Sequence, residues 1–172
     1  MRSGSTRIID TNILLVANKQ HDGVSSQCIL ECVNSLDALR KVGVVVLDDA
    51  HEILREYMLK TTPNTGNRVG DAFLKWLLQN TRNARRVKCV HIEPHQERGY
   101  AEFPEDDELS DFDRADRKFV AVAAKHPKRP PILQAADSKW KAWSPQLAKH
   151  GISIQFLCPQ EIDSFLKRKR AQ

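Results

Sequence analysis

The sequence of 172 residues lacks the features that would assign it to several common protein classes. No run approaches the roughly 18 consecutive apolar residues that a membrane span needs. The first residues lead into Arg7–Asp10 without the apolar segment of a signal peptide, so we expect a cytoplasmic protein with no membrane partner. Neither a CxxC pair nor an HExxH motif occurs, which argues against a zinc ribbon and a zincin-type metal centre.

Cysteine and histidine are few and widely spaced. Cys28 and Cys32 stand four residues apart in a helical pattern, so we interpret them as small core residues rather than as redox groups. His91 and His95 flank Pro94, which prevents the regular helix that would bring both rings to one metal ion. A site built from cysteine or histidine ligands is therefore not expected.

Acidic residues are concentrated in one stretch, and the rest of the chain is basic. The formal net charge is +5, yet residues 102–116 hold eight acids and a single base. The remaining chain has 26 basic against 14 acidic residues. Such a basic body indicates a polyanion partner, with nucleic acid as the first candidate, although a solvated basic surface would give the same composition.

Strand-like and helix-like segments alternate along the chain. The expected strands cover residues 7–10, 43–47, 87–92, 131–134 and 153–157. The expected helices cover residues 25–41, 49–60, 70–80, 113–126 and 140–150, with a last one from about 159. This alternation predicts one α/β layered domain over 1–172 with a mostly parallel sheet and a basic C-terminal tail at about 167–172.

Carboxylates stand at the ends of three of these strand-like runs. Asp10 ends the first, Asp48 and Asp49 the second, and Asp137 follows the fourth. The carboxyl ends of parallel strands open onto one crevice, so these side chains are expected to converge. The adjoining helices add further acids: Glu52, Glu56, Asp113 and Asp116. A divalent cation such as Mg²⁺ or Mn²⁺ would neutralise their mutual repulsion and would bind phosphate oxygens.

Several of these acids also have ordinary structural interpretations. Asp48, Asp49 and Asp113 can each cap a helix, and Glu52 can pair with a neighbouring arginine. Asp10 lies between apolar residues, where an unpaired charge is costly, and Asp137 is in a similar setting. Asp10 and Asp137 are therefore the strongest candidates for metal ligands.

The order of three motifs resembles that of PIN-domain nucleases. Ile9-Asp10-Thr11-Asn12 resembles the opening motif of that family, in which a strand ends in Asp-Thr-Asn or Asp-Thr-Ser. Residues 116–123 are similar to its third motif, an aspartate ahead of an apolar, alanine-rich helix, and residues 136–140 look like its last. Together the motifs span nearly the whole chain, which would be a longer, bacterial-type member of the PIN-domain nuclease family.

This resemblance implies a three-layer α/β/α fold and a Mg²⁺- or Mn²⁺-dependent endoribonuclease acting on single-stranded RNA. The residues matching the metal-binding and catalytic acids are Asp10, Glu56, Asp116 and Asp137, with Glu52 and Asp113 as alternatives. Thr11 and Asn12 would orient Asp10 and a metal-bound water. Lys139 stands where many PIN domains carry another acid, which weakens the case for a second metal ion.

The resemblance also suggests binding partners, and two alternative functions remain beside it. A toxin of a toxin–antitoxin pair or a defence nuclease would act on RNA, and such toxins often form homodimers and bind an antitoxin protein. The basic residues expected to guide the RNA backbone are Arg82, Arg85, Arg86, Lys139 and Lys141. The alternatives are a non-catalytic RNA- or protein-binding module of PIN fold and a structure-directed DNA nuclease.

Overall fold

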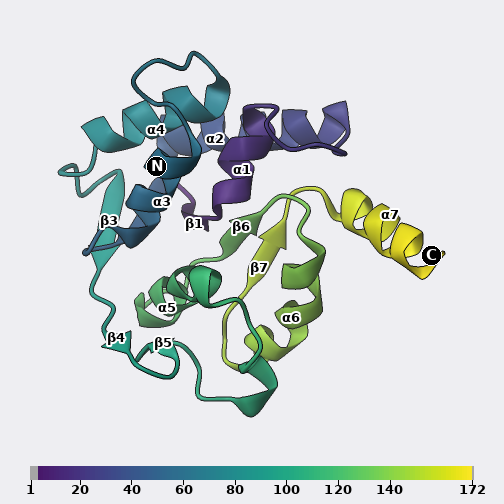
Figure 1. Ribbon diagram of the computed structural model, residues 1–172. Coiled ribbons are helices and arrows are strands. Elements are labelled where there is room, and N and C mark those ends of the chain that lie inside the picture. The colour runs from purple at the N-terminus through teal and green to yellow at the C-terminus, as the bar shows by residue number, and fades with distance from the viewer. Residues whose placement is uncertain (1–3, 172) are drawn as a thin grey trace.

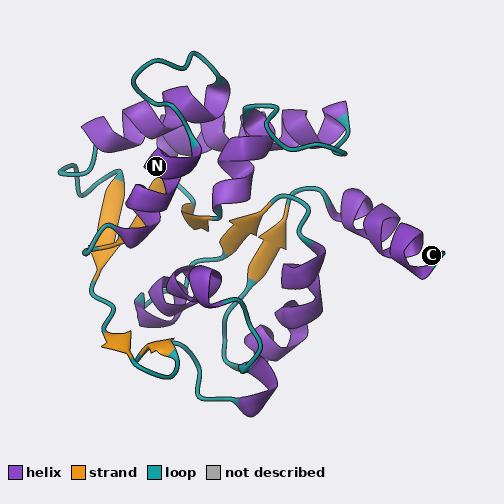
Figure 2. Cartoon of the chain, viewed as in Figure 1, coloured by secondary structure: helices purple, strands orange, loops and turns teal. Residues whose placement is uncertain are grey.

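A parallel sheet of five strands forms the centre of the computed structural model, which describes residues 4–171. Its order is β3-β2-β1-β6-β7, and every neighbouring pair is parallel. The strands are β1 (Thr6–Ile9), β2 (Val44–Asp48), β3 (Val87–Val90), β6 (Ile132–Gln134) and β7 (Ile154–Phe156). All five lie where the alternating pattern predicts strands, and the two outer pairs extend from a central β1 (Figures 1 and 2).

Helices cover both faces of the sheet and give the α/β/α layering (Figure 1). The helices α1, α2 and α4 pack against one another, while α5 packs across β1, β2 and β6. The helix bounds are α1 (Thr11–Ala17), α2 (Ser26–Val42), α3 (Glu52–Lys60), α4 (Val69–Gln79), α5 (Arg117–Lys125), α6 (Ser138–Lys149) and α7 (Pro159–Arg170). The prediction of an α/β fold with a parallel sheet is confirmed.

Polar side chains bind the first backbone amides of α2, which precedes β2, and of α3, which follows it. The hydroxyl of Ser25 accepts a hydrogen bond from the backbone N–H of Cys28 at the start of α2. Asp48, at the end of β2, accepts from the N–H groups of Glu52 and Ile53 at 2.8 and 2.9 Å. These bonds satisfy amides that a helix start leaves without partners, and they set where α3 leaves the sheet.

The core is built from side chains on both faces of the central strands. The run from Val45 to Leu47 is fully buried, as expected for a strand covered by helices on both sides. Beside it, the rings of Phe112 and Trp140 meet edge to face, with centroids 5.1 Å apart. Trp140 thereby fixes the first turn of α6 against the chain that leads into α5.

The acidic stretch is held by polar side chains at the end of α6. Asp106 accepts hydrogen bonds from Gln146 of α6 and from His150, the residue after it, at 2.5 and 2.6 Å. The same stretch contains two short 3₁₀ turns, η1 (Asp107–Leu109) and η2 (Arg114–Asp116). The second of these turns leads directly into α5 and so positions Asp116.

Two small elements were not predicted. The helix α1 has only seven residues, too few for its apolar run to show a helical period. The hairpin of β4 (Pro94–His95) and β5 (Gly99–Tyr100) is a two-residue pair turned by Gly99, whose φ of 84° lies in the left-handed region. The helix α1 and this hairpin lie in connections between predicted elements, so neither changes the strand order of the five-stranded sheet.

A disulfide joins the start of α7 to α2, which corrects the interpretation of the cysteines as core residues without a bond. Cys28 is buried as expected, but its sulfur atom is bonded to that of the buried Cys158, 130 residues further along the sequence. Cys32 is a free thiol in the core, and burial raises its pKa to about 12. The C-terminal helix is therefore tied covalently to the body.

Along the described chain, every helix is too short or too polar to serve as a membrane span. The predicted basic tail forms the last turns of α7 as far as Arg170. Gln172, the end of that predicted tail, lies outside the described residues.

Candidate active site

Four elements bring carboxylates to the carboxyl end of the central strands. Asp10 directly follows β1, and its backbone N–H donates to the carbonyl of Leu133 on the neighbouring strand β6 at 3.0 Å. Asp137 follows β6 and begins α6. Glu56 comes from the second turn of α3, and Asp116 from the junction of η2 and α5. Sequence-distant acids thus meet at one edge, as the strand ends predicted.

Asp10 is the buried centre of this group. Asp10 is 3% exposed, and burial raises the pKa of its carboxyl well above the ordinary value. The negative charges of Asp116, Glu56 and Asp137 raise this pKa further, while the hydrogen bond from the backbone N–H of Asn12 lowers it. Asp10 is therefore close enough to all three other carboxylates to feel their charge, which is the arrangement that a cation would stabilise.

Asp116 is perturbed in the same direction. Burial raises its pKa to about 6, and the charges of Asp113, Glu56 and Asp137 add to the effect. The ammonium of Lys118 opposes it. Ionisation of Asp10 and Asp116 is therefore unfavourable among these carboxylates, and a bound cation would favour their ionised forms.

Asp10 and Asp137 each use one carboxylate oxygen to cap a helix. Oδ1 of Asp10 accepts from the N–H of Asn12 at 2.9 Å, at the start of α1. Oδ1 of Asp137 accepts from the N–H groups of Lys139 and Trp140, at 2.8 and 3.4 Å, at the start of α6. Capping fixes each carboxylate in orientation and leaves its second oxygen for another ligand.

Glu56 is bound at both carboxylate oxygens. Oε1 accepts a hydrogen bond from the hydroxyl of Thr11, and Oε2 forms an ion pair with the ammonium of Lys118, each at 2.5 Å. Thr11 was predicted to orient Asp10, whereas in the structure its side chain orients Glu56. Asn12 does contact Asp10, but through its backbone amide.

Tyr57 is a buried site residue that the sequence did not reveal. Its hydroxyl donates to the carbonyl oxygen of Ile9, the last residue of β1, and burial raises its pKa. This bond holds α3 against the strand that carries Asp10, and so it sets where the adjacent Glu56 lies. The only signal in the sequence was an aromatic residue beside the candidate glutamate.

Of the other candidate acids, Asp113 acts on the adjacent Asp116 through its charge, whereas Glu52, Asp48 and Asp49 do not join the group. Glu52 is paired with Arg55 at 2.7 Å on the outer side of α3, so of the two glutamates it is Glu56 that reaches Asp10. Asp48 is fully buried and occupied by its capping bonds. Asp49 contacts His91 at 2.9 Å, and Asp113 caps η2 through the N–H of Ala115.

The predicted phosphate-guiding residues divide into two groups. Lys139 lines two adjoining hollows, one beside Asp137 and the other beside Asp116. Lys141 lies two residues further along α6, with its ammonium 5.4 Å from the ring centre of Phe156.

The three arginines are placed differently. Arg86 immediately precedes β3, where its carbonyl accepts from the N–H of Val45. Because β2 and β3 run parallel to β1, this position lies at the amino end of the sheet, opposite the carboxylates. Its guanidinium donates to the carbonyl of Leu39 and stacks over Trp76. Arg82 and Arg85 lie in the same turn before β3, so the structure does not bring these arginines to the acids.

The donor set suits a hard divalent cation. Mg²⁺ and Mn²⁺ prefer oxygen ligands, and every candidate ligand is a carboxylate. Within residues 4–171, no three acidic side chains place an oxygen each within 4.8 Å of one another. Asp10, Asp116 and Asp137 have no salt-bridge partner among the described residues, so their charges are open to a cation.

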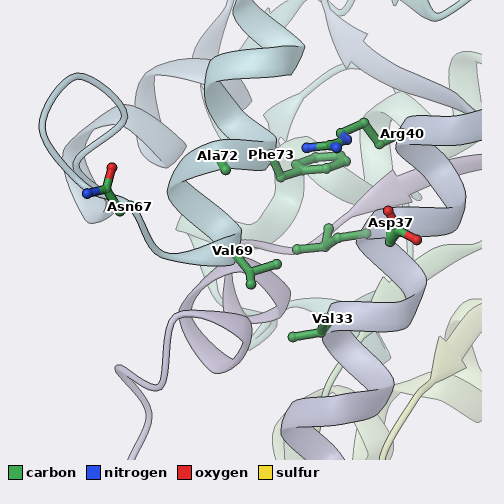
Figure 3. Close-up of a pocket in the computed structure, with 8 residues that line it drawn as sticks. Val33, Asp37, Arg40, Asn67, Val69, Ala72 and Phe73 are labelled. Atoms are coloured by element: carbon green, nitrogen blue, oxygen red, sulfur yellow. The ribbon is translucent and has the colours of Figure 1, made fainter.

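Two other features of the structure, one buried and one at the surface, are separate from this group. The described residues contain one close set of metal-type ligands, the sulfur atoms of Cys28, Cys32 and Cys158, two of which form the disulfide. A hollow of about 270 Å³ lies between α2 and α4, lined by Val33, Leu36, Asp37, Arg40, Asn67, Val69, Ala72 and Phe73 (Figure 3). Neither includes any of the four converging carboxylates.

Comparison of this chain with protein families, with curated proteins and with solved structures gives no match.

Proposed function

We propose that this protein is a metal-dependent endoribonuclease that hydrolyses phosphodiester bonds of single-stranded RNA. The observation that supports it best is the buried Asp10, whose pKa is raised by Asp116, Glu56 and Asp137 at the carboxyl end of a parallel sheet. Repulsion among these carboxylates lowers the stability of the folded protein, and binding of a cation at the site offsets this loss.

The residues that would hold Mg²⁺ or Mn²⁺ are Asp10, Asp116 and Asp137, with Glu56 beside them. When bound, such an ion polarises a phosphodiester and activates a water molecule. Capping of Asp10 and Asp137 holds their carboxylates in fixed directions, so little side-chain freedom is lost when the ligands assemble. Asp116 has a pKa near 6 and is ionised above that pH, which favours cation binding at neutral and alkaline pH.

RNA is the proposed substrate because the body outside residues 102–116 is basic. Lys139 lies next to Asp137 and Asp116, where its ammonium can contact a phosphate of the bound strand. The motif resemblance adds the proposal of a toxin or defence role, with an antitoxin or a second copy as partner. An RNA substrate also favours a cytoplasmic location, although disulfides such as Cys28–Cys158 are rare in that compartment.

The test compares substrates and metals in parallel. End-labelled single-stranded RNA, the same sequence as DNA and a flapped DNA duplex are incubated with the protein in EDTA, Mg²⁺ or Mn²⁺. We expect cleavage of the RNA alone, and only with a divalent ion. Cleavage of the flapped DNA in preference to RNA would replace the proposal by a structure-directed DNA nuclease.

Matched variants separate chemistry from folding. Asp10→Asn and Asp137→Asn keep an oxygen that can cap α1 and α6, so the fold is expected to persist while cleavage falls by about 10²-fold or more. Glu52→Gln, on the outer side of α3, is the control and should cleave like wild type. Loss of folding together with activity in the two aspartate variants would point to structural roles.

A second candidate function is a non-catalytic RNA- or protein-binding module. The cation of Lys139 in the last motif favours it, because an acid is typical there. RNA binding that is unchanged by EDTA, without cleavage under any metal, would support this candidate over the nuclease.

A further inference from the structure

A lysine is built into the group of carboxylates. Lys118 lies in the first turn of α5, two residues after Asp116, and its side chain is 9% exposed. Its ammonium forms the 2.5 Å ion pair with Oε2 of Glu56, donates to the carbonyl of Ala115, and lies 5.0 Å from the ring centre of Phe119. A buried ammonium held by three groups is a fixed part of the site rather than a mobile surface charge.

This lysine determines what Glu56 can bind. One oxygen of Glu56 is occupied by Thr11 and the other by Lys118, so the glutamate has no oxygen without a partner. Within the described chain no salt bridge pairs Asp10, Asp116 or Asp137 with a basic side chain, and Lys118 acts on Asp116 only at longer range. The four acids therefore divide into one that is already neutralised by a cation and three that are not.

Two divalent ions in a hydrolytic site lie roughly 4 Å apart and need carboxylates on both sides. Here the position that Glu56 would offer to the second ion is occupied by an ammonium. Lys139 stands at the position in the last motif where another acid is typical, which removes a further ligand from the same region. The ammonium of Lys118 and one divalent ion would together supply the positive charge that two divalent ions supply in such sites.

We propose that Lys118 is a resident cation that takes the place of a second divalent ion, so that the site binds one ion on Asp10, Asp116 and Asp137. This inference rests on the proposed function, because it assumes that these aspartates hold a metal. It adds that Glu56 is a positioning residue for Lys118 rather than a direct ligand, and that Lys118 neutralises charge beside the phosphate.

Metal stoichiometry tests this inference without any assay of activity. Mn²⁺ is titrated calorimetrically into wild type, Lys118→Met and the control Lys125→Met, and electron paramagnetic resonance then shows whether bound ions are single or coupled. Lys125 is on the same helix, half exposed and 3.6 Å from Glu102, so its loss should not affect the site. Methionine keeps an apolar stem of similar length in place of the buried lysine.

We expect one Mn²⁺ per chain for wild type and Lys125→Met, with the signal of an isolated ion. Removal of Lys118 frees Glu56, so Lys118→Met should bind two ions with a broadened, coupled signal. Two ions in wild type would overturn the inference even if the variant failed to fold, and so would one ion in a folded Lys118→Met. No bound Mn²⁺ in wild type would instead overturn the proposed function, and this inference with it.

Discussion

Neutralising Asp116 should stabilise the protein when no metal is present. In the folded chain its pKa is about 6, against 3.8 for an ordinary aspartate, because burial and nearby carboxylates penalise the charged form. A raised carboxyl pKa contributes stability below pH 4, and this contribution is lost as the pH rises through 6. Two pKa units correspond to about 3 kcal/mol, which partial contact with solvent reduces to about 2 kcal/mol.

Asp116→Asn should therefore raise the free energy of unfolding by about 2 kcal/mol at pH 7.5 in EDTA, or the melting temperature by about 4–8 °C. At pH 3.5 the difference should vanish, because both chains are then uncharged at this position. The assay is urea and thermal unfolding followed by tryptophan fluorescence, with the exposed Asp111→Asn as a matched loss of charge.

Binding of a metal ion should make wild type more stable than Asp116→Asn, the reverse of the order expected in EDTA. At Mn²⁺ concentrations about 100-fold above its dissociation constant, binding stabilises wild type by about 2.7 kcal/mol. Asp116→Asn has lost a ligand and should gain much less. A variant that is less stable than wild type at pH 7.5 in EDTA would refute the reasoning, because it would show that Asp116 makes a stabilising contact as an anion.

Three further predictions concern the frame of the site. Cys158→Ser breaks the bond to Cys28, and release of a 130-residue loop should cost up to about 5 kcal/mol, seen as a lower urea midpoint that reduction of wild type reproduces. Tyr57→Phe removes the bond to Ile9 and should cost about 1 kcal/mol in unfolding while slowing RNA cleavage more than it changes Mn²⁺ binding. Asp71 of α4 accepts hydrogen bonds from Arg68, Asn18 and the backbone N–H of Thr62, and these bonds lower its carboxyl pKa although burial opposes them. Its contribution to the free energy of unfolding should therefore be present above pH 4 and be lost as the pH falls through the folded pKa. An Asp71→Asn chain whose stability kept the wild-type acid dependence would contradict this.

The sheet and the positions of its acids could be predicted because both follow from local patterns. Residues 44–47 are apolar and β-branched without alternation, which indicates a strand covered on both faces. Once the strands are parallel, Asp10 and Asp137 must reach the same edge. The choice of Glu56 over Glu52 rested on the motif resemblance, in which the glutamate lies nearly two turns past the end of the strand.

What could not be predicted depends on contacts between distant segments. The disulfide requires that α7 return to α2, which no local pattern states. Arg86 is a different case: it directly precedes a predicted strand, so the predicted parallel sheet itself places it at the amino end, away from the acids. Lys118 was hidden within an apolar helix motif, and its importance appears only when α3 brings Glu56 to its ammonium.

The most direct test of the central claim is a single-turnover cleavage measurement on end-labelled single-stranded RNA with wild type and Asp10→Asn at pH 7.5. The account predicts that wild type cuts the RNA in Mn²⁺ and not in EDTA, and that Asp10→Asn is about 10²-fold slower or worse while melting at the same or a higher temperature. Cleavage by Asp10→Asn at the wild-type rate, or cleavage by wild type in EDTA, would contradict it.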